Sequence, residues 1–285
     1  MKKIAILLVL VSTLFSSSCS KFLENNVDAI SKKNEQEIND YISKKNLQML
    51  STNTGLRYAI SQNSLGRNIE VGDEATIHYS LTLLDGTKID STQRLANKPI
   101  KIIFGGVQII SGFLEAMSLL KEGERGSFIL PSIIGFGSQS SATIPANSVL
   151  KLDLETLKLR SEDQQIEEYV KGTKFPVTEK TTTGLRIIKT VESNGTQLKA
   201  GLLATVKYTG YLASNITQFD TGQIDVALGD GAVVKGFEEG LLKLKVGEKA
   251  TLVFPSAIGY GTTGSGTKIP PYSPLIFTVE VISAK

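Results

Sequence analysis

The sequence predicts an α+β protein that contains two copies of one domain, each an antiparallel twisted sheet wrapped on one short helix. Residues 112–137 return as residues 236–261 with the same order of Gly, Phe, Glu, Pro and Ser, at a constant offset of 124 residues. The segment 54–57 and Tyr79 return at an offset of 129 residues. A repeat of this length indicates two globular units, because each copy is near the usual size of a domain.

The first 18 residues, with Lys2-Lys3, an apolar run and three serines before Cys19, resemble a bacterial lipoprotein signal peptide. Lys2 and Lys3 give a positive start, and the apolar run 4–15 is too short to span a membrane. Three serines then precede Cys19, the one cysteine of the sequence. Cys19 is therefore expected to carry the lipid after cleavage, and an intrachain disulfide is not possible. The alternative is an ordinary secretion signal with an incidental cysteine.

The charge of the chain argues against a nucleic-acid partner. The formal net charge is +3, and loss of Lys2 and Lys3 with the signal would lower it by two. No basic field of the kind that nucleic-acid-binding domains carry would remain. Two Asn-x-Thr triplets, at Asn194 and Asn215, fit the glycosylation pattern, and we interpret them as chance matches.

The patterns divide the chain into five parts. Residues 20–34 are mostly polar and are expected to be a tether, whereas Glu35 to about Leu50 has a weakly apolar helical face. A second helical stretch, Glu162–Val170, is followed by a glycine and a proline. We therefore expect these parts: signal peptide 1–18, tether and short helix 19–50, first domain 51–160, linker 161–180 and second domain 181–285.

Each domain is predicted to contain strands with one buried face. In the first domain, Ile77 to Leu83 alternates apolar with polar residues, and Asp85-Gly86 is a hairpin signal. Alternation also marks the segment from Leu150 to Leu154. In the second domain it marks residues 205–209 and 275–281. Each domain has one set of apolar residues at helical spacing: Phe113, Met117 and Leu120, and Phe237, Leu241 and Leu244.

The residue types exclude several kinds of chemistry. His78 is the one histidine, and it is expected to face solvent or pack only slightly, on the strand face opposite Tyr79. No nucleophile is indicated beside it. Because His and Cys do not cluster and no glycine motif for phosphate follows a strand, we expect no metal and no cofactor. The acidic pair Glu238-Glu239 is expected on an exposed helix face.

Aromatic residues from several predicted elements remain. Tyr208, Phe219, Phe237 and Phe277 could simply be core residues. Tyr260 is different, because it lies between two glycines, an unusual place for a core tyrosine. The Gly/Thr/Ser-rich loop that follows it could cover a pocket.

These residues carry a resemblance to the tandem FKBP-type peptidyl-prolyl cis-trans isomerases. The resemblance covers roughly residues 70–160 and 200–285. It rests on these motifs: Val206–Gly210, Phe219-Asp220, Val233–Gly240, Ile258–Gly261 and Ile269–Pro271. The family fold, a five- or six-stranded antiparallel sheet around a short helix, agrees with the strand and helix pattern.

The resemblance also implies roles for particular residues of the second domain. Tyr208, Asp220 and Tyr260 are expected to be catalytic, with the Tyr260 hydroxyl and the Val234 N–H bonded to substrate carbonyls. The residues expected to contact the substrate are Phe219, Ile224, Val233, Val234, Phe237, Ile269 and Phe277.

The first domain departs more from the family pattern. Its matching residues are Tyr79, Asp90, Ile109, Ile110 and Phe113. Its departures are Ile89 for Phe219, Phe136 for Tyr260, Leu152 for Phe277 and Ala146 for Pro271. The second domain in turn lacks six residues after Asp220, so we expect its site to be more open on that side.

The resemblance implies a lipid-anchored prolyl isomerase of the bacterial envelope. We expect it on the outer membrane facing the periplasm, with the second domain catalytic and with unfolded or proline-containing envelope proteins as clients. Two alternatives stay open: a non-catalytic chaperone that binds proline-containing segments, and an envelope scaffold.

Overall fold

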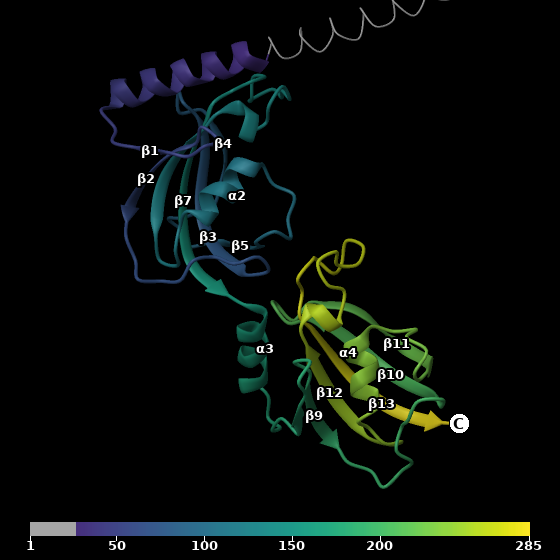
Figure 1. The fold of residues 1–285 in the computed structure, drawn as a ribbon. Helices are drawn as coiled ribbons and strands as arrows, with labels where there is room; N and C mark the ends of the chain where they lie inside the picture. Colours follow the sequence, from purple (N-terminus) through teal and green to yellow (C-terminus); the bar gives the residue numbers. More distant parts are fainter. Residues whose placement is uncertain (1–26) are drawn as a thin grey trace, which may run out of the picture. The chain divides into compact units, whose positions relative to one another are not determined.

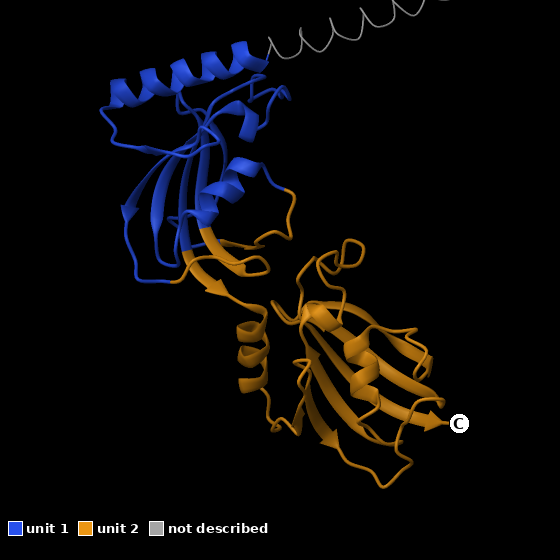
Figure 2. Ribbon diagram, in the orientation of Figure 1, with its two compact units in different colours: residues 1–66, 78–99, 109–156 blue, residues 67–77, 100–108, 157–285 orange. Residues whose placement is uncertain are grey.

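The computed structural model describes residues 27–285 (Figure 1). The described chain divides into two compact units (Figure 2), which comprise residues 27–66, 78–99 and 109–156, and residues 67–77, 100–108 and 157–285. We use "first repeat" for residues 51–160 and "second repeat" for residues 181–285.

The N-terminal helix is longer than predicted at its start and shorter at its end. Residues 27–45 are helical, so the described part of the expected tether is helix, and Asn46 ends the helix with a positive φ of 51°. The prediction went wrong at Asn34, a polar residue on the buried face. Asn34 and Ile38 are both buried, and Ile38 packs against Ile129 and Val149 of the first unit.

The first repeat contains a seven-stranded antiparallel sheet, and α2 (Ser111–Ser118) lies across one face of it (Figure 1). Phe113 and Met117, predicted to share the buried face of that helix, are buried together with Ala116, and the third predicted residue, Leu120, is buried just after the helix ends. The strand order is β1-β2-β6-β7-β3-β4, with β5 also paired to β3. The strands are β1 (Leu50–Ser51), β2 (Arg57–Gln62), β3 (Glu74–Leu83), β4 (Lys88–Ser91), β5 (Ile100–Ile103), β6 (Arg125–Leu130) and β7 (Leu150–Arg160).

The second repeat contains a six-stranded antiparallel sheet in the order β11-β10-β13-β12-β9-β8, crossed by α4 (Lys235–Leu241). Its strands are β8 (Glu179–Lys180), β9 (Arg186–Val191), β10 (Leu203–Leu212), β11 (Gln218–Ala227), β12 (Lys249–Phe254) and β13 (Leu275–Ala284). The helix predicted before this repeat is α3 (Glu162–Lys171), which starts with a capping box between Ser161 and Gln164.

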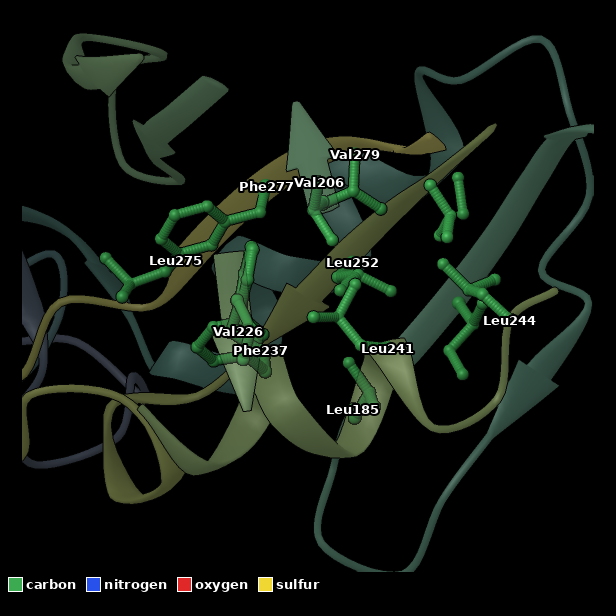
Figure 3. Close-up of a cluster of buried hydrophobic side chains, with 14 of the residues drawn as sticks. Leu185, Val206, Val226, Phe237, Leu241, Leu244, Leu252, Leu275, Phe277 and Val279 are labelled. Atoms are coloured by element: carbon green, nitrogen blue, oxygen red, sulfur yellow. The ribbon is translucent and has the colours of Figure 1, made fainter. Parts of the chain in front are cut away.

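The core of the second repeat lies between α4 and the sheet (Figure 3). Leu241 of α4 and Leu252 of β12 lie beside each other in this core, and Phe277 of β13 belongs to the same cluster. The helix approaches the sheet closely because Gly236 and Gly240 face it. A Cβ atom at these positions would lie 2.6 Å from the ring of Phe254 and 2.4 Å from the side chain of Leu252. The predicted packing of one helix on one sheet is confirmed in each repeat.

The expectation for His78 is wrong, because the side chain is only 5% exposed. Its Nδ1 lies 2.9 Å from Oγ1 of Thr92. Residues 92–99, which join β4 to β5, fold back over the outer face of the sheet, where Arg94 reaches Glu155 at 2.7 Å. A cavity of about 820 Å³ lies between this segment and the strands. The alternation of apolar and polar residues along β3 does not indicate that residues 92–99 cover this face.

None of the helices in residues 27–285 combines the length and the apolar character needed to cross a membrane.

Candidate active site

Four aromatic rings of the second repeat gather around Phe277 in the middle of β13. The ring centroid of Phe277 lies 4.9 Å from Phe237, 5.5 Å from Phe219, 6.1 Å from Tyr208 and 5.8 Å from Phe254. The contacts with Phe237 and Phe219 are edge-to-face, a geometry that aromatic pairs favour. Residues from β10, β11, β12, β13 and α4 thus form one aromatic cluster, and Phe254 is a member that the sequence analysis missed.

The structure places the residues predicted to contact substrate in this cluster or against it. Phe219, Phe237, Ile269 and Phe277 are buried. The partly buried residues packed against them include Tyr208, Ile224, Val233, Val234 and Tyr260. Asp220 is exposed at the rim. The cluster therefore has a buried aromatic floor and a border of half-buried side chains.

Close approach of the floor residues depends on Gly210 in β10. A Cβ atom there would lie 2.6 Å from the ring of Phe219 and 2.9 Å from the ring of Phe277. Such separations are too short for carbon atoms, so only glycine leaves both rings in place. The position equivalent to Gly210 in the first repeat is Leu81, which is buried. The sequence analysis missed this exchange, although alignment of the two repeats displays it.

Tyr208 and Asp220 form a hydrogen-bonded pair at the rim. The Tyr208 hydroxyl donates to Oδ2 of Asp220 at 2.7 Å, and the backbone N–H of Thr221 donates to Oδ1 at 2.9 Å. This hydrogen bond, together with burial and the Asp220 charge, raises the pKa of Tyr208 to about 12. Tyr208 is therefore a neutral donor committed to Asp220 at neutral pH.

Tyr260 has a hydroxyl with no partner among the described residues. It follows the short 3-10 helix η2 (Ser256–Ile258), and it is half-buried between Gly259 and Gly261. Burial, and then the charge of Asp220, raise the pKa of Tyr260 above its ordinary value. The hydroxyl consequently stays protonated and available as a donor.

A second available donor lies at the start of α4. The carbonyl of Val234, the N-cap residue, accepts from the N–H groups of Phe237 and Glu238. The N–H of Val234 itself donates to no group in residues 27–285. With the Tyr260 hydroxyl, it provides two hydrogen-bond donors beside an apolar surface.

The loop after Tyr260 is attached to the border of the cluster. Ser265 and Ile269 exchange backbone hydrogen bonds of 2.8 and 3.2 Å, which closes the loop on itself. Lys268 extends its Nζ to the carbonyl oxygen of Phe219 at 3.2 Å. The loop predicted as a cover is thus fastened to the strand that supplies Phe219 and Asp220.

The six-residue difference between the repeats changes the edge of the sheet. In the second repeat β11 is one ten-residue strand beside β10, with a register shift at Phe219. In the first repeat the same edge consists of two four-residue strands, β4 and β5, separated by residues 92–99. The expectation that the second site is more open on this side stays a prediction.

The first repeat keeps the polar pair and Phe113, the equivalent of Phe237, but has aliphatic residues in place of Phe219 and Phe277. The Tyr79 hydroxyl donates to Asp90, and burial, followed by that hydrogen bond, raises the pKa of Tyr79 to about 12. The ring of Tyr79 lies 5.3 Å from Phe113, edge-to-face. The remaining predicted equivalents are buried Leu152, partly buried Ile89, Ile110 and Phe136, and exposed Ile109.

The fold and the cluster together define a class of α+β domains in which one short helix and an antiparallel sheet enclose an aromatic cluster bordered by hydrogen-bond donors. The sequence has one histidine and one cysteine, and neither lies in the second repeat. Within residues 27–285, His, Cys, Asp and Glu side chains form no group that could hold a metal ion.

Comparison with known proteins identifies the family. The model of the FKBP-type peptidyl-prolyl cis-trans isomerases matches residues 66–157 and 194–282. The chain belongs to this family of enzymes.

Individual relatives match with moderate identity. Human peptidyl-prolyl cis-trans isomerase FKBP10 is 29% identical over 224 residues, which cover 76% of this chain and 35% of the relative. FkpA of Aeromonas hydrophila, an FKBP-type isomerase, is 35% identical over 109 residues, which cover 38% of this chain and 40% of the relative. The crystal structure of the three FKBP domains of wheat FKBP73 covers 84% of this chain and 99% of its own, with 22% identity and a TM-score of 0.41. The matched regions are thus well under half of the two curated relatives.

Proposed function

We propose that this chain isomerises X–Pro bonds and that the second repeat carries the active pocket. The observation that carries the proposal is the combination of an aromatic cluster around Phe277 with two available donors, the Tyr260 hydroxyl and the Val234 N–H. A proline ring has an apolar surface that such a cluster can cover, and the donors are of the right kind for the carbonyls beside it.

The reaction needs no proton transfer and no nucleophile. The X–Pro bond turns slowly because its partial double bond must be twisted, and uncatalysed exchange takes tens of seconds or more. The twisted amide has less resonance and depends less on water than the planar one. A dry pocket therefore favours the twisted form over the ground state, which is how binding energy lowers a barrier.

In this proposal the residues have separate tasks. Phe219, Phe237 and Phe277 cover the proline ring, with Tyr208, Ile224, Val233 and Ile269 around it. The Val234 N–H and the Tyr260 hydroxyl hold the substrate carbonyls. Asp220 fixes the Tyr208 ring through the 2.7 Å hydrogen bond and supplies the polar edge of the pocket.

The first repeat serves in this proposal as the weaker, client-holding unit. It keeps the Tyr79–Asp90 hydrogen bond and the edge-to-face contact of Tyr79 with Phe113. Ile109, which is 37% exposed, adds apolar surface beside them. These features support binding of extended apolar segments. They are also what a chaperone without isomerase activity would use, so binding alone is the second candidate function.

We further propose that the protein is exported and anchored by lipid at Cys19, on the outer membrane facing the periplasm, where it acts on unfolded or proline-containing envelope proteins. The support is the Lys2-Lys3 start and the apolar run before Cys19, which lie outside the described residues. Stable anchoring needs more than one acyl chain. Cys19→Ser is expected to release the protein from membranes in a fractionation experiment, and unchanged partitioning would contradict the anchor.

The isomerase proposal is tested on the full chain with a matched pair of variants. Phe237→Leu and Phe113→Leu make the same change at equivalent positions of the two repeats. The rate of cis/trans exchange of an X–Pro peptide is expected to fall about tenfold or more for Phe237→Leu and to change little for Phe113→Leu. A folded chain that binds the peptide without accelerating exchange would favour the chaperone function instead.

A further inference from the structure

The helix that precedes each repeat is joined to the aromatic turn of that repeat by one polar side chain. In the second repeat this side chain is Glu162, in the first turn of α3. Its Oε2 accepts the backbone N–H of Ser256 at 2.6 Å, and its Oε1 accepts the Ser256 hydroxyl at 2.7 Å. Ser256 is 4% exposed, so water does not readily replace these two bonds.

From Ser256 the connection continues to both sides of Tyr260. The Ser256 carbonyl accepts the N–H of Gly259 and the N–H of Gly261, each at 2.8 Å. The carbonyl of Gly261 in turn accepts the N–H of Tyr272 at 2.9 Å. One serine thus fixes the two glycines that flank Tyr260, and Glu162 fixes that serine.

The same arrangement recurs in the first repeat, with an amide in place of the carboxylate. Oδ1 of Asn34 accepts the N–H of Ser132 at 2.8 Å. The Ser132 carbonyl accepts the N–H groups of Gly135 and Gly137, each at 2.9 Å, on either side of Phe136. Because the same helix-to-serine connection occurs in both repeats, we interpret it as a structural feature of the repeat. The carboxylate version occurs only beside the tyrosine.

An arginine, buried in the second repeat and partly buried in the first, holds each helix in place for this contact. Arg186 of β9 binds Asp163 and Glu167 of α3 and also the carbonyl of Gly184. In the first repeat Arg57 binds Glu35 of the N-terminal helix and the carbonyl of Gly55. The repeated Thr-Gly-Leu-Arg segment therefore serves to dock the preceding helix.

We propose that Glu162 is a positioning residue for isomerisation, which acts through Ser256 to hold the Tyr260 hydroxyl where it meets a substrate carbonyl. The inference rests on the proposed function of the second repeat. A carboxylate that accepts two donors from one residue makes stronger and more restrictive bonds than neutral groups do. Its loss leaves a buried N–H and hydroxyl without their acceptor, and the turn is then free to shift.

The experiment is a double-mutant cycle on the full chain with Glu162→Ala and Tyr260→Phe, measured as kcat/KM for X–Pro exchange. Each single variant is expected to lose about fivefold, the factor that one hydrogen bond of about 1 kcal/mol gives. The double variant is expected to be no slower than Tyr260→Phe alone, because Glu162 acts only through that hydroxyl. Further loss in the double variant, or no loss in Glu162→Ala, overturns the proposal.

Two more variants separate positioning from stability. Glu162→Gln keeps an oxygen that accepts the Ser256 N–H, as Asn34 does for Ser132, and is expected to restore most of the rate. Glu168 lies in the same helix, but its carboxylate pairs with Lys158 and Arg160 and not with Ser256. Glu168→Ala removes that carboxylate. It is expected to leave the rate unchanged. Equal losses for Glu168→Ala and Glu162→Ala would mean that α3 matters only for stability.

A readout without peptide keeps this test independent of the isomerase proposal. The pKa of Tyr260, followed by NMR of labelled tyrosine and assigned with Tyr260→Phe, is raised by burial and by Asp220 in the native chain. In Glu162→Ala it is expected to fall toward its ordinary value as the turn moves into solvent. If the native chain shows no isomerisation, an unchanged Tyr260 pKa in this variant still overturns the positioning role.

Discussion

The two repeats keep the same polar pair above differently filled floors. Tyr79 with Asp90 and Tyr208 with Asp220 make equivalent hydrogen bonds. Below them, the second repeat combines a glycine with two phenylalanines, and the first combines three aliphatic residues. The two sets are Gly210, Phe219 and Phe277, and Leu81, Ile89 and Leu152. The comparison teaches that these three positions change together, because a side chain at position 210 would collide with the rings of Phe219 and Phe277.

The largest expected effect comes from removing one ring of the floor. Phe237→Ala deletes a buried side chain that contacts Phe277 at 4.9 Å and Tyr208 at 5.9 Å. We expect loss of most of the isomerase rate together with about 3–5 kcal/mol of stability, the usual range for such a deletion. Peptide exchange and denaturant unfolding measure the two losses. Phe113→Ala is the control, expected to lose similar stability while it keeps most of the rate.

The second-largest effect is expected from a substitution at Gly210, where the two repeats differ. Gly210→Ala places a carbon 2.6 Å from the Phe219 ring, so we expect the ring to move, at a cost of about 1–3 kcal/mol for overpacking. The rate should fall about tenfold. Gly222→Ala is the control in the neighbouring strand, because its Cβ would meet nothing closer than 3.7 Å. Similar rates for the two variants would show that the position of the Phe219 ring does not limit catalysis.

The comparison can also be tested by giving the first repeat the floor residues of the second. Ile89→Phe with Leu152→Phe is not expected to raise activity while Leu81 fills the space that the rings need. Adding Leu81→Gly should raise the exchange rate about tenfold, from the aromatic contacts that the two rings can then make. The gain is best measured in a Phe237→Leu background, where the lowered activity of the second repeat no longer masks that of the first. A gain that is the same with and without Leu81→Gly would contradict this account.

The smallest effect distinguishes the two polar pairs by pH. Both tyrosine pKa values are about 12, above the ordinary 10.0, so each pair adds stability below pH 10 that disappears as the pH rises through 12. The hydrogen bond to Asp220 is the main cause for Tyr208, and burial is the main cause for Tyr79. Asp220→Ala should therefore lower the pKa of Tyr208 more than Asp90→Ala lowers that of Tyr79, as tyrosine titration by NMR would report.

Much of the fold followed from local patterns. Alternation predicted β3, β7, β10 and β13, and helical spacing predicted α2 and α4. These signals work because one face of each element is buried against the other layer. The errors came from contacts between distant segments. Asn34 is polar and His78 lies on an outer strand face, yet tertiary packing buries both.

The residues of the candidate site could be predicted where they match the motifs of a known family. Their convergence around Phe277 agrees with that prediction, whereas the roles of these residues stay predictions. Phe254, Gly210 and Glu162 were missed for different reasons. Phe254 and Gly210 matter because of how closely they pack against other side chains, which the residue type alone does not indicate. Glu162 lies 98 residues before Tyr260 in the chain, so only folding brings it near the turn.

The ten-residue strand β11 is expected to favour aggregation of the protein in concentrated solution. It lies at the end of its sheet, and among the described strands it pairs only with β10. A ten-residue edge without proline offers unpaired backbone groups to any extended chain, and Asp220 and Asp225 are the charges that oppose such pairing. The first repeat divides the same edge into two short strands with Pro99 between them. We therefore expect aggregation to begin more readily at the edge of the second repeat than at that of the first.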